Sequence, residues 1–372
     1  MNNNSLRLRP SVSVIPTSDA KIWEFFQSNT RRMKHIRLAD AQLAQIIFSL
    51  NNDSISDLII KFPHLEKTIN TLIPVLVEWC MIEYVSVANH IEASRYYRFL
   101  NFLADYIPSN KVLGIFNNIE QSTVLIVGVG GVGSWIATSL AQSGVKNFII
   151  CDPDVVKPHN LNRSLFKSDD VGKLKTQVIH RNIELLGDNY NIIEVNHLIE
   201  SSKHITEILN RNPNIDLVIN SSDYPDVDTT SKIIFKPCME RNIPHIIAGG
   251  YNLHLSLIGA TIIPNETACF KCIEKGLEEQ QEEDFSSIRK LQRKKRNIGN
   301  LSPLAGISAS FTINEALRVL SKSEKLKPIM VNRRGEFNFL TSEVAFSDFE
   351  KRSDCAWCGI EQRHNKKIQR TV

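Results

Sequence analysis

The pattern of apolar positions along this 372-residue chain changes near residue 109. Between Ile22 and about Tyr106 most apolar residues recur at the three- and four-residue intervals of a helix face. The clearest such face comprises Ile69, Leu72, Ile73, Leu76, Trp79 and Cys80. Residues 81–87 are instead rich in β-branched and aromatic side chains, which favours a strand. We predict a small winged-helix-like domain at residues 18–108, preceded by a polar, flexible N-terminus at residues 1–17.

From residue 109 onward, short apolar runs alternate with helical segments. The pattern predicts strands at 124–127, 147–151, 192–196, 217–220 and 245–248, and helices at 133–143, 172–186, 229–241 and 303–321. A further pair of strands is expected within 253–263. Alternating strands and helices are typical of a parallel sheet covered on both faces. We therefore predict an α/β fold at residues 109–372, with a Rossmann-like, doubly wound, mainly parallel sheet.

Composition and charge exclude some classes of protein. The net charge of +4 is too small to indicate a nucleic-acid partner. No run approaches the roughly 18–20 apolar residues of a membrane helix, and the polar start of the chain lacks a secretory apolar core. We expect a soluble, cytoplasmic protein without nucleic-acid or membrane partners.

Four glycines follow the first predicted strand of the α/β domain and begin the next helix: Gly128, Gly130, Gly131 and Gly133. Glycines at such a turn let backbone N–H groups approach phosphate oxygens, and the helix N-terminus adds partial positive charge. Asp152 ends the following strand, where a carboxylate can accept hydrogen bonds from a ribose. This pattern predicts nucleotide binding, although a tight turn without a ligand would look similar. NAD and FAD are also compatible with the glycines and Asp152.

The residues after Asp152 favour phosphate chemistry over hydride transfer. The loop that contains Asn160 and Arg163, followed by Gly172 and Lys175, places two cations just beyond the predicted ribose site. Hydride transfer needs no such cations, whereas attack on a phosphate does, because negative charge must be stabilised as pyrophosphate leaves. The alternative is a solvated loop with surface Arg and Lys.

These motifs resemble the E1-like adenylating superfamily, which includes ThiF, MoeB and the ubiquitin-activating enzymes. The shared pattern is a GxGGxG turn, an Asp-x-Asp strand end, an Asn-Leu-x-Arg loop and a Gly-x-x-Lys helix start, and all four occur here in order. Ser164 departs from the pattern, since many members have Gln after the arginine. The resemblance implies that Asp152 binds ribose and that Asp154, the second aspartate of the motif, also binds ATP. It also implies that Asn160, Arg163 and Lys175 contact the phosphates.

The resemblance assigns two further residues to catalysis. Asp223 follows a predicted buried strand and matches the family's aspartate that organises Mg²⁺. Apart from the resemblance, its position at the carboxyl end of a strand also favours binding of a metal ion. The simpler alternative is that Asp223 is the N-cap of the next helix. The segment Arg95–Arg98 resembles the family motif whose second arginine reaches the partner subunit's ATP site. Arg98 therefore implies a homodimer.

Four of the seven cysteines form two CxxC pairs: Cys269, Cys272, Cys355 and Cys358. Two such pairs can supply the four thiolates of a closed, structural zinc site, and free thiols are the alternative. The remaining cysteines lie in apolar contexts that are typical of small core residues: Cys80, Cys151 and Cys238. We find no candidate for a thioester-forming cysteine, which argues against a ubiquitin-activating enzyme.

The segment 274–300 carries an acidic run, 278–284, and then a basic run, 289–296. The acidic run nearly neutralises the basic one, so we interpret the segment as a charged loop over the active site. A solvated insert and an RNA-binding patch are the alternatives.

About 120 residues precede the glycine turn, enough for a folded module. This arrangement is similar to the microcin-type peptide-adenylating enzymes, and within them to the pantocin-type maturation enzymes. The resemblance implies that the N-terminal domain binds a short ribosomal precursor peptide, and that ATP with Mg²⁺ adenylates a carboxylate of it in antibiotic biosynthesis. In the pantocin type, glutamate side chains are activated and then cyclise. The alternatives are adenylation of a sulfur-carrier protein's C-terminal glycine, an NAD-dependent oxidoreductase and a non-catalytic peptide-binding scaffold.

Overall fold

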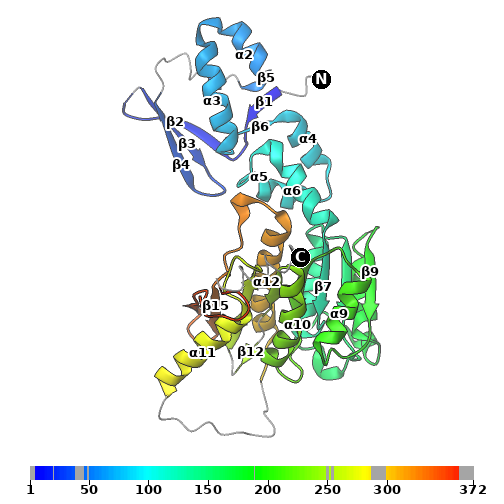
Figure 1. Ribbon diagram of the computed structural model, residues 1–372. Helices are drawn as coiled ribbons and strands as arrows, with labels where there is room; N and C mark the ends of the chain where they lie inside the picture. Colours follow the sequence, from blue (N-terminus) through cyan, green and yellow to red (C-terminus); the bar gives the residue numbers. More distant parts are fainter. Residues whose placement is uncertain are drawn as a thin grey trace, which may run out of the picture. The chain divides into compact units, whose positions relative to one another are not determined.

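The computed structural model divides into two compact units, Met1–Asn117 and Asn118–Val372 (Figure 1). It describes residues 5–19, 21–37, 46–47, 50–187, 189–248, 251–252, 255–285 and 299–359. Helix α6 (Ser109–Gln121) runs from the first unit into the second. Within the described ranges, no helix combines the length and the apolar character that crossing a bilayer would require.

The N-terminal unit contains two antiparallel three-stranded sheets, in the orders β5-β1-β6 and β2-β3-β4. The strands are β1 (Ser5–Leu8), β2 (Val12–Pro16), β3 (Ile22–Gln27), β4 (Arg32–Arg37), β5 (Asn51–Ser54) and β6 (Ile82–Tyr84). The helices are α2 (Ile55–Lys61), η1 (Pro63–Leu65), α3 (Glu66–Glu78), α4 (Val85–Ala93) and α5 (Tyr97–Ala104). Leu6, Phe25, Leu58, Ile73 and Ile82 are buried in its core. The apolar face predicted around Ile69 therefore belongs to a helix, α3.

Two predictions for this unit were wrong. Residues 5–16 are not a flexible tail, because β1 and β2 pair with other strands and Leu6 is fully buried. The stretch from Ile22 to Arg37 is not helical but forms the β3–β4 hairpin. β4 has little apolar alternation, with the sequence RMKHIR, so its pairing with β3 determines its conformation rather than a pattern in its own residues.

The C-terminal unit is built on a six-stranded sheet in the order β14-β11-β10-β7-β8-β9. All neighbouring strands are parallel except β14, which runs antiparallel to β11. The strands are β7 (Thr123–Val127), β8 (Asn147–Cys151), β9 (Asn191–Val195), β10 (Ile215–Asn220), β11 (His245–Ile247) and β14 (Ala260–Ile262). This arrangement confirms the predicted α/β fold with a mainly parallel sheet.

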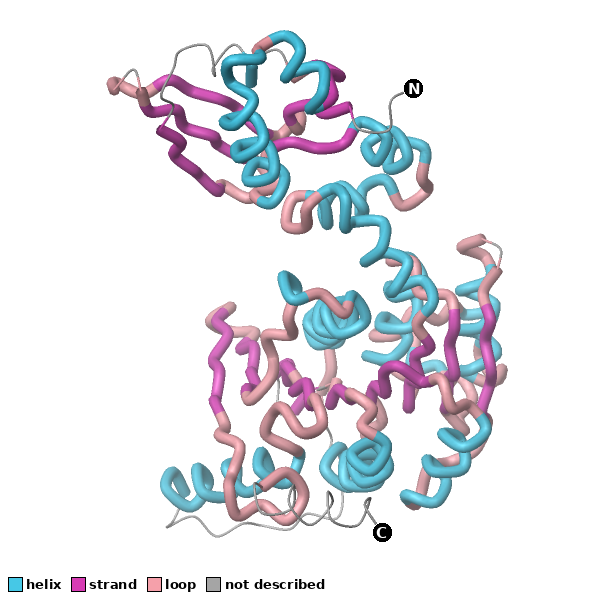
Figure 2. The backbone as a smooth tube through the Cα atoms, turned by 45° about the horizontal axis from the view of Figure 1, so that its top comes forward, coloured by secondary structure: helices cyan, strands magenta, loops and turns pink. Residues whose placement is uncertain are grey.

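Helices lie on both faces of this sheet (Figure 2). Helices α9 (Ser202–Arg211) and α10 (Val227–Arg241) pack on one face, against Leu125, Ile149 and Val218. On the other face α7 (Gly131–Gln142) packs against α12 (Ser302–Ser321) and α8 (Lys175–Glu184). The central strands are buried on both faces, which explains why they read as continuous apolar runs in the sequence.

A second, antiparallel sheet has the order β12-β13-β15-β16. Its strands are β12 (Tyr251–Asn252), β13 (Leu255–Ile258), β15 (Arg333–Asn338) and β16 (Glu343–Asp348). The strands expected within 253–263 exist, but they do not pair with each other: β13 pairs with β12 and β15, whereas β14 completes the large sheet. Helix α11 (Phe270–Phe285) and the turns η2 (Pro158–Asn160), η3 (Ser168–Asp170) and η4 (Glu324–Leu326) complete the described elements.

Candidate active site

The glycine turn lies at the carboxyl end of β7 and opens into α7. Gly128 has a φ of +88°, which a side chain would strain. A β-carbon on Gly133 would lie 2.0 Å from the carbonyl oxygen of Gly128, so α7 can pack on the turn only without one. At Gly130, the N-cap of α7, a β-carbon would meet no described atom within 4 Å. The space beside Gly130 is therefore open at the N-terminus of α7, the end of a helix at which phosphates bind.

Asp152 links the glycine turn to the residues that follow β8. Its side chain is buried, and Oδ2 accepts a hydrogen bond of 2.9 Å from the backbone N–H of Val129. Oδ1 accepts bonds from the N–H of Asp154, at 2.9 Å, and from Nζ of Lys175, at 3.4 Å. The carboxylate predicted to bind ribose thus lies directly beside the turn predicted to bind phosphate.

Lys175 begins α8, and its ammonium is held between two carboxylates. Nζ lies 2.8 Å from Oδ2 of Asp154 and 3.4 Å from Oδ1 of Asp152. The hydrogen bond from Lys175 holds the pKa of Asp154 below its usual value. A buried ammonium needs such partners, because removing it from water is costly. The structure therefore brings together the Asp-x-Asp and the lysine that the sequence placed more than 20 residues apart.

The loop after β8 places Arg163 against the glycine turn. The stem of Arg163 lies 3.4 Å from where a β-carbon of Gly131 would stand, so the missing side chain leaves it room. Its Nη1 donates to the carbonyl of His159 at 2.6 Å, while Nε is buried without a partner among the described residues. Asn160 is buried, and its Oδ1 caps the short turn by accepting from the N–H of Lys157. An unpaired guanidinium N–H beside the turn can donate to an anion.

Asp223 lies in the loop that connects β10 to α10, and its side chain is exposed. The preceding residues contact the glycine turn: a β-carbon on Gly128 would be 2.8 Å from the backbone N of Ser222. The cap of α10 is Asp226, which accepts a hydrogen bond from the N–H of Thr229. The N-cap alternative for Asp223 is therefore wrong, and its carboxylate is available to solvent near the turn.

Ser221 is a residue that the sequence analysis did not single out. Its Oγ donates to the carbonyl oxygen of Gly128 at 2.6 Å, and its N–H bonds the carbonyl of Val127. These bonds connect the end of β10 to the end of β7. The only sequence signal for this contact is a hydroxyl residue directly after a buried strand.

Arg98 belongs to the N-terminal unit. It lies on α5, with its guanidinium 5.6 Å from the centre of the Tyr97 ring. The other residues predicted for the active site lie in the C-terminal unit, around the carboxyl ends of β7, β8 and β10.

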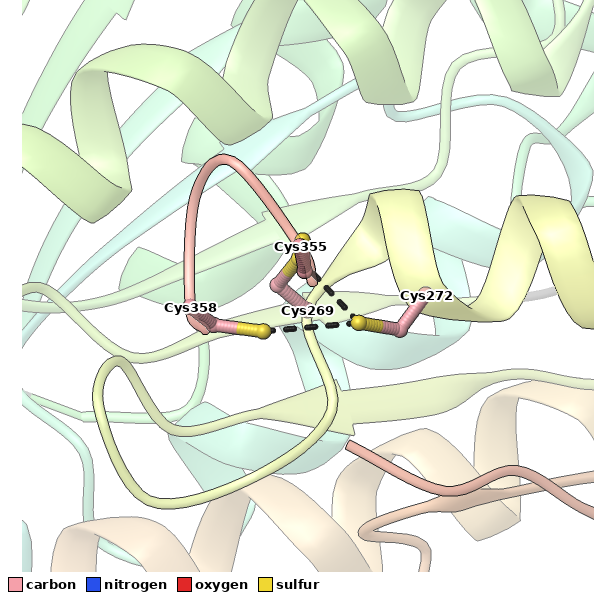
Figure 3. Close-up of side chains that lie close together, drawn as sticks. All are labelled: Cys269, Cys272, Cys355 and Cys358. Atoms are coloured by element: carbon pink, nitrogen blue, oxygen red, sulfur yellow. Dashed lines mark hydrogen bonds between the residues drawn. The ribbon is translucent and has the colours of Figure 1, made fainter. Parts of the chain in front are cut away.

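The four cysteines of the CxxC pairs converge in the C-terminal unit (Figure 3). All four sulfur atoms lie within 4.8 Å of one another, and the closest pairs are 3.4 Å (Cys272–Cys358) and 3.6 Å (Cys269–Cys355) apart. Zinc with Zn–S bonds of about 2.3 Å in a tetrahedron separates its sulfurs by about 3.8 Å. The spacing matches such a site, and four protein ligands leave no open position for catalysis.

The other three cysteines are buried, as predicted. Burial raises the pKa of Cys151 to about 12, and burial also raises the pKa of Cys238. Such thiols are poor nucleophiles near neutral pH. The acidic run 278–284 lies in α11, whereas the basic run 289–296 is outside the described residues, so the interpretation of 274–300 as a loop over the site stays a prediction.

Comparison with known proteins identifies relatives over most of the chain. The model of the ThiF family matches residues 109–358. Ubiquitin-like modifier-activating enzyme 5 of Dictyostelium discoideum is 26% identical over 277 residues, which cover 69% of this chain and 68% of that protein. Other enzymes of that name are covered to a smaller share of their own length: 61% of the rice protein, over 278 residues, and 52% of a Drosophila mojavensis protein, over 213 residues.

Solved structures match nearly the whole chain. Escherichia coli MccB, crystallised with AMPCPP and MccA, has a TM-score of 0.70 at 20% identity, over 95% of this chain and 99% of that chain. PaaA has a TM-score of 0.66 at 18% identity, over 92% of this chain and 100% of that chain. At these identities the matches establish a shared fold that includes the N-terminal unit. The predicted resemblance to E1-like enzymes with a microcin-type architecture is confirmed, and none of these relatives is named as an oxidoreductase.

Proposed function

This chain belongs to the ThiF family, whose E1-like members are ATP-dependent adenylyltransferases, and we propose that it adenylates a carboxylate of a ribosomally made precursor peptide. The observation that carries this proposal is the match to MccB over 95% of the chain, in a crystal structure that holds both AMPCPP and MccA. The match to MccB also covers the N-terminal unit, whereas the model of the ThiF family matches only from residue 109 onward. We assign peptide binding to residues 18–108 on this basis.

The carboxyl edge of the parallel sheet would bind ATP. Asp152 accepts the ribose hydroxyls, and the open backbone at Gly130 with the N-terminus of α7 receives the phosphates. Arg163 and Lys175 supply positive charge beside them, and Asn160 holds the loop that carries Arg163. Asp223 would hold Mg²⁺, which neutralises phosphate charge when bound. Arg98 would complete the site of the second subunit in a homodimer.

The proposed chemistry has two steps. A carboxylate oxygen of the peptide attacks the α-phosphorus of ATP, the bond from that phosphorus to the bridging oxygen breaks, and pyrophosphate leaves. A nucleophile of the same peptide then attacks the acyl carbon and AMP leaves. The cations around the phosphates stabilise the charge that grows on the leaving pyrophosphate. Binding of the peptide by the N-terminal unit would raise the local concentration of its reactive carboxylate.

We further propose that the activated groups are glutamate side chains of the peptide, as in the pantocin-type enzymes, so that the product is a cyclised peptide. The support is the resemblance of the motifs together with the long N-terminal unit. The Cys269–Cys272 and Cys355–Cys358 pairs would hold a structural zinc that joins the segment around Cys355 to the start of α11.

The names of the sequence relatives favour a second candidate function. The Dictyostelium discoideum enzyme called ubiquitin-like modifier-activating enzyme 5 matches 69% of this chain, so the substrate would instead be the C-terminal carboxylate of a small protein modifier or sulfur carrier. The buried state of Cys80, Cys151 and Cys238 argues against transfer to a thiol of this chain.

Isotope exchange between pyrophosphate and ATP separates the two candidates. The purified chain is incubated with ATP, Mg²⁺ and either a short peptide encoded beside its gene or a Gly-Gly-ending carrier protein. We expect exchange with the peptide only, and mass spectrometry should then show a product lighter by one water. Exchange with the carrier alone would contradict the peptide proposal, and binding of NADH without ATP would contradict adenylation.

A further inference from the structure

Asp154 and Lys175 are joined by both their side chains and their backbones. Nζ of Lys175 lies 2.8 Å from Oδ2 of Asp154, and the N–H of Lys175 donates to the carbonyl oxygen of Asp154 at 3.0 Å. A bridge between Val155 and Leu174 extends this pairing. The start of α8 is thereby fixed to the segment that follows β8.

The two partners differ strongly in exposure. The Lys175 side chain is 9% exposed, whereas the Asp154 side chain is 54% exposed. An ammonium so far from water depends on its acceptors, because an unpaired buried charge is costly. The carboxylate of Asp154 is exposed to water and does not require a partner to stay ionised. The contact therefore stabilises the charge of Lys175 more than that of Asp154.

Asp152 is the weaker of the two acceptors of this lysine. Its carboxylate already accepts from the N–H groups of Val129 and Asp154, and its distance to Nζ of Lys175 is the longer one, 3.4 Å. If Asp152 also binds the ribose hydroxyls, less of its capacity remains for Lys175. Asp154 is then the acceptor that keeps the ammonium in place.

We propose that Asp154 is a positioning residue: its carboxylate holds the Lys175 ammonium in place for the phosphates of ATP without itself contacting the nucleotide. This inference rests on the proposed ATP-dependent function. It replaces the expectation that Asp154 binds the cofactor directly with a role that acts through Lys175. Direct contact of Asp154 with ribose or a metal ion is the alternative, and it predicts a different pattern of binding losses.

The test is a double-mutant cycle on the full chain, with binding measured by calorimetry. The variants are Asp154→Asn, Lys175→Ala and the two combined, and the ligands are ATP with Mg²⁺ and AMP. The ratio of the ATP affinity to the AMP affinity reports contacts to the β- and γ-phosphates. We expect each single variant to lower this ratio about tenfold, as for loss of one charge-assisted hydrogen bond. The combined variant should lower it no further than Lys175→Ala alone.

Additive losses in the combined variant would overturn the inference, because Asp154 would then act independently of Lys175. An equal loss for ATP and AMP would also overturn it, since that pattern indicates contact with the part of the ligand that both share. Asp154→Glu, which keeps the charge, should restore part of the ratio, and a merely structural role would not produce that rescue.

Asp348→Asn is the matched control. Asp348 is an exposed carboxylate on β16 that pairs with Arg333 at 2.6 Å, so its loss also removes an ion pair, but it should leave the ratio unchanged. Wild-type protein that binds neither ATP nor AMP would contradict the proposed function as well as this inference. ATP binding with an additive cycle would contradict the role of Asp154 alone.

Discussion

Gly133 packs directly on the carbonyl of Gly128: a β-carbon on Gly133 would lie 2.0 Å from that oxygen and 2.7 Å from Oγ of Ser221. Both atoms are fixed, since the first belongs to the backbone and Ser221 donates to the same carbonyl. Gly131 lies in the same turn of α7, yet the nearest atoms to a β-carbon there would be those of the Arg163 side chain, at 3.4–3.5 Å. Two glycines of one motif therefore have different roles.

We predict that Gly133→Ala destabilises the protein by about 3 kcal/mol or prevents folding, because the added carbon overlaps backbone that cannot move away. Gly131→Ala should change stability by no more than about 1 kcal/mol, and in the stabilising direction, since alanine favours a helix over glycine. Urea unfolding followed by circular dichroism measures both. Equal stability of the two variants would show that α7 does not pack on the turn as described.

The central strands of the C-terminal sheet could be predicted from the sequence because they are buried on both faces. β8 was predicted with its observed bounds, 147–151, since every residue after Asn147 is apolar and buried. β4 was missed because four of its six residues are charged or histidine and its order comes from pairing with β3. Such nonlocal pairing leaves no periodic signal in the strand itself.

At the candidate site, likewise, a local motif identifies the residues, whereas their contacts depend on the tertiary structure. Asp152, Arg163 and Lys175 were predicted because their spacing follows a family motif. The hydrogen bond from Val129 to Asp152 and the pairing of Lys175 with Asp154 depend on how β7, β8 and α8 pack. Spacing identifies which residues act at the site, whereas packing decides which of them contact one another.

Asp223 provides a test of the proposed metal role. Its side chain is exposed and does not cap α10, so Asp223→Asn should leave the melting temperature unchanged. We expect this variant to lose pyrophosphate exchange by about a hundredfold or more, because charge on the phosphates would no longer be neutralised. Asp228→Asn, an exposed change in the first turn of α10, is the control and should keep full exchange. Full activity of Asp223→Asn would exclude the assigned role.

The cysteine cluster predicts one zinc ion per chain, which elemental analysis by mass spectrometry measures. Four thiolates packed this closely repel one another unless a cation compensates their charge, and zinc binding supplies that cation. Cys355→Ser should lose the metal and melt at a lower temperature, as should wild-type protein treated with a strong chelator. Cys238→Ser removes a buried thiol outside the cluster and should keep the zinc. Equal metal content in both variants would argue against the site.

Asp170, in the loop before Lys175, should make the stability of the protein depend on pH. Its carboxylate accepts from Arg181, at 2.7 Å, and from the N–H of Lys167, and the hydrogen bond from Arg181 lowers its pKa. A lowered pKa in the folded state stabilises the protein above the unfolded value of about 3.9, and this stabilisation is lost as the pH falls through the folded value. Asp170→Asn should therefore cost about 1–3 kcal/mol at neutral pH and progressively less as the pH approaches about 3. Urea unfolding across this pH range is the measurement, with the exposed neighbour Asp169→Asn as control; a difference independent of pH would contradict the assignment.

Arg9 ties the first strand to the core of the N-terminal unit, where it lies buried between two carboxylates. Its guanidinium donates to Glu83 and to Asp105, both at 2.9 Å, and all three side chains are less than 10% exposed. Removing one member of a buried ionic group leaves the others without a partner, which typically costs about 3–5 kcal/mol.

We predict that Arg9→Met reduces protection from hydrogen exchange throughout β1 and β3 while β7 and β8 keep theirs, because the two units have separate cores. Hydrogen exchange with mass spectrometry resolves these segments, and the exposed Arg37→Met on β4 is the matched control. Unchanged protection in Arg9→Met would mean that the N-terminal strand contributes little to the unit, as the sequence alone had suggested.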